Sequence, residues 1–326
     1  MKLRSALLTG LLAASLAGNA LAVTSAKFAV TLPEKSHQGL GVARFIELVK
    51  AKSNGEIEIK PYYNGILGND VQVTSALQGG TIEFTVPQTT TLTGMVKAFE
   101  LLDFPFLFKN TAQADKILDG PVGEKLLETL PEHRLIGLAY WENGFFNTTN
   151  SKRPIVKAED FQGLKFRSIQ ARITQETIKA LGANPVPLAV PELYTALETR
   201  TIDGQGTPNA VITPLKLYEV QKYLSITRHS YGAFIPLVSK DFWDTLTPGQ
   251  QQILKDAAIE TRAYQREVAR KQDEAARELM ARNGMQINEV SDAEYARMRE
   301  QVQPVWHMFI PNVGQALFDQ AQAELK

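Results

Sequence analysis

Segments with the two-residue period of a strand alternate along this chain with segments that have the 3.6-residue period of a helix, and this alternation restricts the fold most. In the first half, strand-like and helix-like segments follow one another at 26–31, 38–52, 56–59, 71–78 and 82–86. A further helix over 116–130 and a strand over 135–141 are expected. This order predicts a parallel sheet with helices on both faces.

The same pattern begins again in the second half, after the polar run 147–153. Here the predicted elements are a strand, a helix, a strand, a helix and a strand, over 164–168, 171–181, 185–188, 191–199 and 201–203. Two such units in one chain of 326 residues predict a two-lobed α/β fold, made of two doubly wound domains with a cleft between them.

One long helix is predicted to join the two lobes. Thr247-Pro248-Gly249-Gln250 forms a capping box with proline at the first helical position, and no further proline or glycine occurs before Gly284. A helix over 248–283 would be about 54 Å long, which exceeds one small domain. The apolar repeat is not sustained as a coiled coil requires. We therefore expect domain I at 23–146 plus about 230–265, and domain II at 147–229 plus about 266–326.

The N-terminus has the features of an export signal. Lys2 and Arg4 precede the apolar run 7–17, and Ala20-Leu21-Ala22 is a small-x-small cleavage sequence. We expect cleavage after Ala22 and a periplasmic mature protein. Without residues 1–22 the chain has 33 basic and 35 acidic side chains, which argues against nucleic acid or anionic membrane as a partner. There is no cysteine, so the fold depends on core burial and not on disulfides.

Ligands of open parallel α/β sheets bind beyond the carboxyl ends of the strands. The loops at those ends contain neutral hydrogen-bonding groups and an aromatic residue: Gln88, Thr89, Trp141, Asn143, Thr207 and Asn209. Arg167, at the end of strand 164–168, adds a permanent charge with a planar array of donors that fits a carboxylate. This combination suits a small anion held by one ion pair and several neutral hydrogen bonds.

Catalytic and cofactor-binding patterns are absent from the sequence. No cysteine nucleophile and no Gly-x-Ser-x-Gly motif is present, and the four histidines lack the spacing of a zinc site. Gly39-Leu40-Gly41 lacks the third glycine of a dinucleotide-binding loop. The sequence favours a binding protein without metal or cofactor. An enzyme that uses the same cleft remains the alternative.

Several longer motifs occur in an order that is typical of one family. They are Ser36-His37-Gln38-Gly39, the segments 63–70 and 76–82, Leu102-Asp103-Phe104-Pro105-Phe106-Leu107-Phe108, Trp141-Glu142-Asn143-Gly144-Phe145, Arg153-Pro154-Ile155, Gly163-Leu164-Lys165-Phe166-Arg167, Pro185-Val186-Pro187, and the segments 192–197 and 202–205. Over nearly its whole length the mature chain resembles the solute-binding proteins of TRAP transporters, the DctP family.

The resemblance implies a two-domain protein that closes on its ligand, and a membrane partner with a small and a large integral subunit that uses an ion gradient. It implies that Arg167 holds the ligand carboxylate. We further expect hydrogen bonds from Thr207 and Asn209 in one lobe, and from Gln88, Thr89, Asn143 and Trp141 in the other. Glu34, His37 and Asp70 are candidates to order ligand hydroxyl groups or water. The protein is expected to be a monomer.

Two positions depart from the family pattern. Thr207 stands where many members have asparagine, and Phe146 stands where many have a second arginine. Phe146 offers an aromatic surface instead of a charge, which weakens the case for a sugar acid such as sialic acid and favours a less charged or more apolar acid. The ligand is then a C4-dicarboxylate-like acid, a hydroxy or keto acid, or an aromatic monocarboxylic acid. A dicarboxylate would require Arg172, Lys35 or His37 to take the second charge. A binding protein for an ATP-driven importer is the alternative within the transport class.

Overall fold

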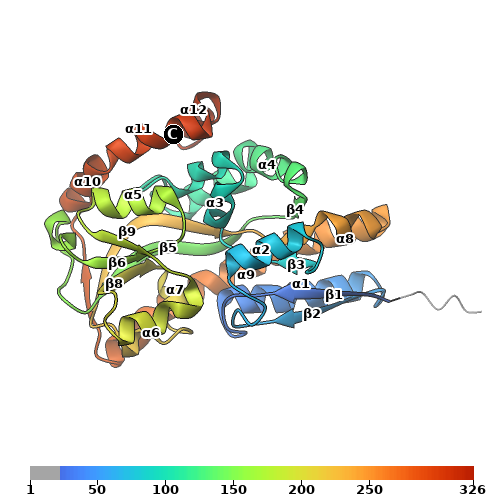
Figure 1. Cartoon of the computed structure of the whole chain (residues 1–326), viewed down its shortest axis with the longest axis horizontal. Coiled ribbons are helices and arrows are strands. Elements are labelled where there is room, and N and C mark those ends of the chain that lie inside the picture. The colour runs from blue at the N-terminus through green and yellow to red at the C-terminus, as the bar shows by residue number, and fades with distance from the viewer. Residues whose placement is uncertain (1–22) are drawn as a thin grey trace, which may run out of the picture.

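The computed structural model describes residues 23–326, and it contains two mixed β-sheets. The predicted signal peptide, residues 1–22, lies outside the described residues. Figure 1 shows the first sheet in the right half of the molecule and the second in the left half. The predicted α/β fold class is confirmed, with helices packed against both sheets.

The first sheet has five strands in the order β2-β1-β3-β10-β4. Their bounds are Ile57–Tyr62, Thr24–Ala29, Phe84–Thr85, Leu237–Ser239 and Leu135–Gly137. The helices α1 (His37–Lys52), α2 (Asp70–Gln78) and α8 (Lys240–Thr245) accompany it. The expected all-parallel pairing holds for β1, β2 and β3 only, because β10 inserts antiparallel between β3 and β4. Because β10 is far from β3 and β4 in the sequence, no local sequence pattern predicts that it pairs with them.

The second sheet has six strands in the order β11-β9-β5-β8-β6-β7. Their bounds are Gln286–Glu289, Tyr223–Phe234, Trp141–Asn150, Gly204–Thr207, Lys165–Ser168 and Asn184–Pro187. The helices α5 (Arg172–Ala180), α6 (Leu193–Glu198) and α7 (Asn209–Ile212) follow β6, β7 and β8.

Three sequence predictions in these regions were wrong in detail. The polar run from Asn147, expected to separate the two units, continues β5 to Asn150, because it pairs with β8 and β9. The last strand of the second unit is β8 and not 201–203. The helix expected over 116–130 is divided into α3 (Thr111–Asp119) and α4 (Pro121–Glu128), since Pro121 cannot continue a helix from the preceding turn.

The long helix α9 (Pro248–Arg282) has 35 residues and begins with the predicted capping box, so that prediction is confirmed. It packs against α1, which accompanies the first sheet, and against α7, β5 and β11 of the second-sheet half. The predicted domain boundaries after 146 and 229 fall inside β5 and β9.

The C-terminal helices cover the upper part of the molecule in Figure 1. They are α10 (Asp292–Gln301), α11 (Gln303–Val313) and α12 (Gln315–Glu324). α11 packs on α5 and on the 3₁₀ segment Lys97–Asp103, and α12 packs on α3 and α4. Trp306 on α11 donates its indole N–H to the carbonyl of Pro105, at 3.0 Å. This explains the apolar run 102–108, which forms a buried core beneath the C-terminal helices.

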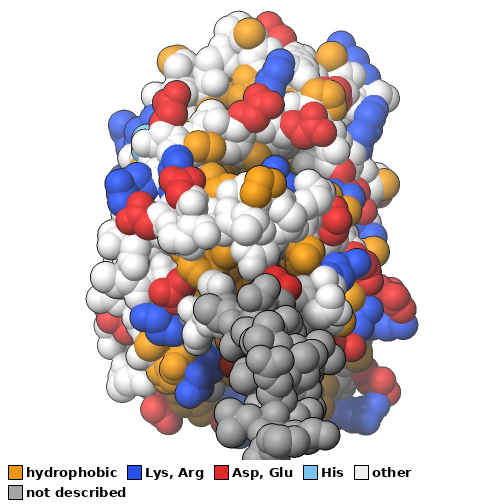
Figure 2. All heavy atoms as spheres, turned by 90° about the vertical axis from the view of Figure 1, so that its right-hand side faces the viewer, with side chains coloured by type: hydrophobic (Ala, Val, Ile, Leu, Met, Phe, Trp, Pro, Cys, Tyr) orange, Lys and Arg blue, Asp and Glu red, His pale blue; other side chains and the backbone are white. Residues whose placement is uncertain are grey.

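The surface carries mixed charge. On the face drawn in Figure 2, acidic and basic side chains are interspersed outside the grey region. No helix within residues 23–326 combines the length and the apolar character that a membrane span requires.

Candidate functional site

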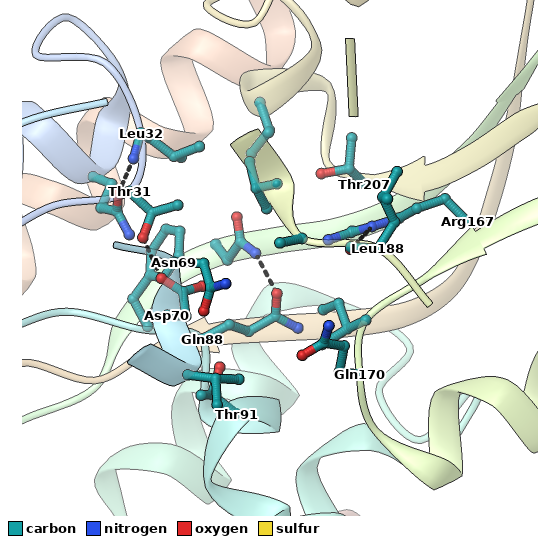
Figure 3. A pocket seen from close by; sticks show the side chains of 18 of the residues that line it. Thr31, Leu32, Asn69, Asp70, Gln88, Thr91, Arg167, Gln170, Leu188 and Thr207 are labelled. Carbon is teal, nitrogen blue, oxygen red and sulfur yellow. Dashed lines mark hydrogen bonds between the residues drawn. The ribbon is translucent and has the colours of Figure 1, made fainter. Parts of the chain in front are cut away.

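A cavity lies between the two sheets, and most of its lining follows the carboxyl ends of strands. Leu32 follows β1, Asp70 follows β2, and Gln88 follows β3. From the second sheet come Arg167 and Gln170 at the end of β6, Leu188 after β7, and Thr207 at the end of β8. Figure 3 shows these residues converging on one space from both sides. The cavity therefore lies where ligands of open α/β sheets bind, beyond the carboxyl ends of the strands.

Arg167 is the central cation of the cavity. Its side chain is only 6 % exposed. Its Nε donates to the carbonyl of Leu188 at 2.9 Å, and among the described residues no carboxylate lies within 4.0 Å of its guanidinium. Burial lowers the pKa of Arg167 to about 10, and the negative charge of Asp70 partly opposes this shift. The group is therefore still protonated at neutral pH, and its charge lacks a close counterion.

Asp70 lies on the opposite side of the cavity from Arg167 (Figure 3). It is the first residue of α2 and accepts a hydrogen bond from the hydroxyl of Thr31. Burial raises the pKa of this carboxyl, while the hydrogen bond from Thr31 and the charge of Arg167 lower it. The cavity thus has a positive side and an acidic side, separated by neutral groups.

The neutral groups form a chain of hydrogen bonds. Asn143 Nδ2 donates to Gln88 Oε1 at 3.2 Å, and Gln88 Nε2 donates to Thr90 Oγ1 at 2.8 Å. The Thr90 hydroxyl in turn donates to a carboxylate oxygen of Asp103. These hydrogen bonds fix the orientation of the Gln88 amide at the cavity wall, because its oxygen accepts from Asn143 and its nitrogen donates to Thr90.

Six of the eleven predicted site residues line the cavity: Arg167, Thr207, Gln88, Asn143, Phe146 and Asp70. Phe146 lines the cavity with only 8 % of its surface exposed, so its ring is an apolar part of the cavity wall.

The other five predicted residues are not part of the lining. Trp141 Nε1 donates to the carbonyl of Ala258 on α9, at 3.2 Å, and Asn209 Nδ2 donates to Asp273 on α9, at 3.1 Å. His37 is fully buried, with its ring centroid 5.5 Å from that of Phe234. Thr89 is buried in the 3₁₀ segment Thr89–Gly94, and Glu34 is exposed.

A β-bulge explains why the side chains of Trp141 and Asn143 point in different directions. Side chains two residues apart on a regular strand point to the same face. In β5, however, the pairing with β9 shifts between Glu142 and Gly144, and Asn143 is the extra residue. The bulge directs Asn143 into the cavity while Trp141 points to α9.

Sequence reasoning did not single out several other lining residues. They are Thr31, Leu32, Gln38, Asn69, Val71, Thr91, Ile169, Gln170, Leu188, Ala189, Val190, Val211 and Phe234. Many of them lie in or beside the loops at the carboxyl ends of the predicted strands, so their position in these loops could have identified them as lining residues. Gln38 also joins two loops of the first sheet, because its side chain accepts a hydrogen bond from Leu32 N and donates one to the Val86 carbonyl, both at 2.9 Å.

Metal chemistry finds no support in residues 23–326, which contain no group of three or more histidine, aspartate or glutamate side chains arranged to hold a metal ion. The cavity instead combines one uncompensated cation, neutral donors and acceptors, and apolar walls from Phe146, Phe234 and Leu188. Such a site can bind a small anion and orient it.

Comparison with known proteins places the chain among solute-binding proteins. Residues 28–312 match the model of the DctP family, described as bacterial extracellular solute-binding protein, family 7. The sugar acid binding protein DctPAm from Advenella mimigardefordensis, solved in complex with galactonate, is 37 % identical with a TM-score of 0.91, over 93 % of this chain and 98 % of that one.

Two curated relatives are similarly close. The 2,3-diketo-L-gulonate-binding periplasmic protein YiaO of Escherichia coli is 35 % identical over 97 % of this chain and 96 % of its own length. The C4-dicarboxylate-binding protein DctB of Bacillus subtilis is 31 % identical over 89 % and 83 %. These are solute-binding proteins and not enzymes. This chain belongs to the DctP family, the solute-binding proteins of TRAP transporters.

Proposed function

We propose that this chain is a periplasmic receptor that captures a small organic acid through its carboxylate and delivers it to a TRAP-type, ion-gradient-driven membrane transporter. The observation that carries the proposal is Arg167, a buried guanidinium that lines the cavity and has no carboxylate partner among the described residues. A buried charge without a counterion is unfavourable until a ligand supplies one. The ligand carboxylate does so through charge-assisted hydrogen bonds.

The charges of the cavity favour a ligand with a single carboxylate. Arg167 is the one cationic side chain that residues 23–326 contribute to the lining. Arg172 packs on the ring of Phe309, 5.8 Å from its centroid, and Lys35 is exposed outside the cavity. Burial lowers the pKa of His37 to about 4, so this ring is neutral at physiological pH. None of the three candidates for a second charge is therefore in place.

Among the ligand classes predicted from the sequence, we favour a hydroxy or keto monocarboxylic acid. Asp70 faces Arg167 across the cavity and would repel a second carboxylate, whereas it can accept a hydrogen bond from a hydroxyl group. The galactonate-bound relative and the 2,3-diketo-L-gulonate-binding relative support this class. The C4-dicarboxylate-binding relative supports the runner-up.

We also propose that the cavity closes by movement of the two predicted domains, 23–146 with about 230–265 and 147–229 with about 266–326. The boundaries fall within β5 and β9, and α9 packs on α1 beside the first sheet and on β5 and β11 of the second. Closure would exclude water from the Arg167–carboxylate pair and strengthen it.

The test is calorimetric titration of the wild type and the Arg167→Met variant with D-galactonate, 2,3-diketo-L-gulonate and succinate. We expect a sugar acid to bind the wild type, and Arg167→Met to weaken that binding at least thirtyfold, because one partner of a buried charge pair is removed. Arg172→Met, which removes a nearby arginine outside the cavity lining, should leave the affinity within twofold. Binding by Arg167→Met within a few-fold of the wild type would contradict the assignment.

A further inference from the structure

A second, smaller cavity, which we call the inner cavity, adjoins the ligand cavity at Arg167. The two cavities share four lining residues, Gln88, Phe146, Arg167 and Ile169. The inner cavity reaches further to Asp103, Ser168 and His229, and its volume is about 40 Å³. On this scale a water molecule needs roughly 10–15 Å³, so the space has room for a few non-hydrogen atoms.

Two buried polar atoms at this inner cavity lack a hydrogen-bond partner. Asp103 is 3 % exposed, and its Oδ2 has no partner, although its Oδ1 accepts from Thr90. Ser168 is also 3 % exposed, and its hydroxyl has no partner. Buried polar atoms in native proteins are almost always paired with protein, water or ligand. The inner cavity thus presents one acceptor and one hydroxyl that await partners.

The electrostatics of the inner cavity select a neutral group. Burial raises the pKa of Asp103 to about 7, and the nearby charge of Glu100 adds to the shift. Burial lowers the pKa of His229 to about 4, so this ring contributes no positive charge at neutral pH. A second carboxylate would meet Asp103 without a cation beyond Arg167 in the described lining. A hydroxyl group can donate to Asp103 and accept from Ser168.

From this geometry we infer that the inner cavity is a second subsite of the ligand site, in which Asp103 and Ser168 bind a hydroxyl group of an acid whose carboxylate is held by Arg167. The inference rests on the proposed function and deepens it. Because Arg167 lines both cavities, an acid on its guanidinium has carbon atoms within reach of the inner space. In the free protein, water would occupy the subsite, and the ligand hydroxyl would replace it.

The experiment compares hydroxylated acids with their deoxy counterparts: D-galactonate with hexanoate, and D-erythronate with butanoate. Affinities are measured by calorimetry for the wild type, Ser168→Ala and Asp103→Asn. Removing the Ser168 hydroxyl breaks no hydrogen bond of the protein, so this variant should fold normally. Ser239→Ala is the matched control, because Ser239 is also buried and unpartnered but lines neither cavity.

We expect the wild type to prefer a hydroxylated acid over its deoxy counterpart by at least tenfold. Ser168→Ala and Asp103→Asn should each reduce that preference about five- to tenfold, as the loss of one hydrogen bond to a buried partner implies, while changing deoxy-acid binding less than twofold. Ser239→Ala should change neither affinity.

The outcomes separate this inference from the function on which it rests. If no acid binds the wild type, the proposed function fails together with the subsite. If acids bind through Arg167 but both inner variants keep the full hydroxyl preference, the proposed function stands and the subsite is overturned. The subsite is likewise overturned if hydroxylated and deoxy acids bind the wild type equally well.

Discussion

At the scale of single residues, the candidate site contains one arginine whose surroundings are unfavourable for its charge in the ligand-free protein. Arg167 is buried, and the only hydrogen bond of its side chain within the described residues is to the Leu188 carbonyl. Its lowered pKa measures the cost of keeping the charged form in this environment. That cost is present at every pH below about 10, and a bound carboxylate offsets it. Functional sites are often locally destabilising in this way.

This cost predicts that Arg167→Met raises the stability of the ligand-free protein. The shift of the Arg167 pKa to about 10 corresponds to about 3 kcal/mol, and losing the hydrogen bond to Leu188 subtracts about 1 kcal/mol. We expect a net gain of about 1–2 kcal/mol and a Tm higher by roughly 2–5 °C. The measurement is thermal unfolding of both proteins after refolding from denaturant, which removes any co-purified ligand. A fall in Tm of several degrees would mean that Arg167 stabilises the free fold.

At the scale of elements, α9 is held to the first half of the chain by a ladder of arginines. Arg262, Arg266 and Arg270 follow one another at four-residue spacing and pair with Asp119 and Asp115 on α3. Arg270 also pairs with Glu142 in the β5 bulge, at 2.8 Å. The amide of Gln265 bonds both the N–H and the carbonyl of Glu142, at 2.7 Å each. The helix thereby fixes the bulge that directs Asn143 into the cavity.

Arg266 of this ladder and Arg297 on α10 both bind a carboxylate through two oxygens, but the loss of stability on substitution should differ between them. Arg266 binds both oxygens of Asp119, at 2.6 and 2.9 Å, with only 9 % of its side chain exposed. Arg297 binds both oxygens of Glu159 but is 44 % exposed. Because buried ion pairs are costly to break and exposed ones are screened by water, Arg266→Met should lose about 2–4 kcal/mol of stability and Arg297→Met clearly less. Urea denaturation gives both values, and equal losses would contradict the role assigned to burial.

At the scale of the whole molecule, two buried histidines couple stability to pH. Burial lowers the pKa of His37 and of His229 to about 4, from an unfolded value of 6.5. Between these values the unfolded chain binds more protons than the native protein. Stability from these groups is therefore complete above about pH 6.5 and is lost as the pH falls toward 4. Asp103, with its pKa raised to about 7, acts in the opposite sense between pH 4 and 7.

The prediction for the histidines is direct. In NMR spectra of the native protein, the ring signals of His37 and His229 should keep their neutral positions from pH 8 to pH 5. His37→Gln and His229→Gln should each flatten the acid side of the stability curve, by up to about 1.4 kcal/mol per pH unit between 6.5 and 4. Titration of either ring with a midpoint near 6.5 in the native protein would show that it is not buried as the structure places it.

The sequence alone predicted most of the alternation of strands and helices, the long helix and the strand-end loops that line the cavity. Periodicity and capping are local properties, so β1, α1, α9 and the loop after β6 were predictable, and Arg167 with them. The family resemblance then predicted which of the charged residues in those loops binds the ligand carboxylate.

Only the tertiary structure decided which side chains enter the cavity. Trp141 and Asn209 belong to the predicted site by position along the chain, but both are committed to α9. Asn143 enters because a bulge in β5 interrupts the alternation of faces. Strand register and bulges depend on partners far away in the chain, β9 for β5 and β10 for β3 and β4. A one-residue shift in such pairing reverses the direction of a side chain, and no local pattern encodes it.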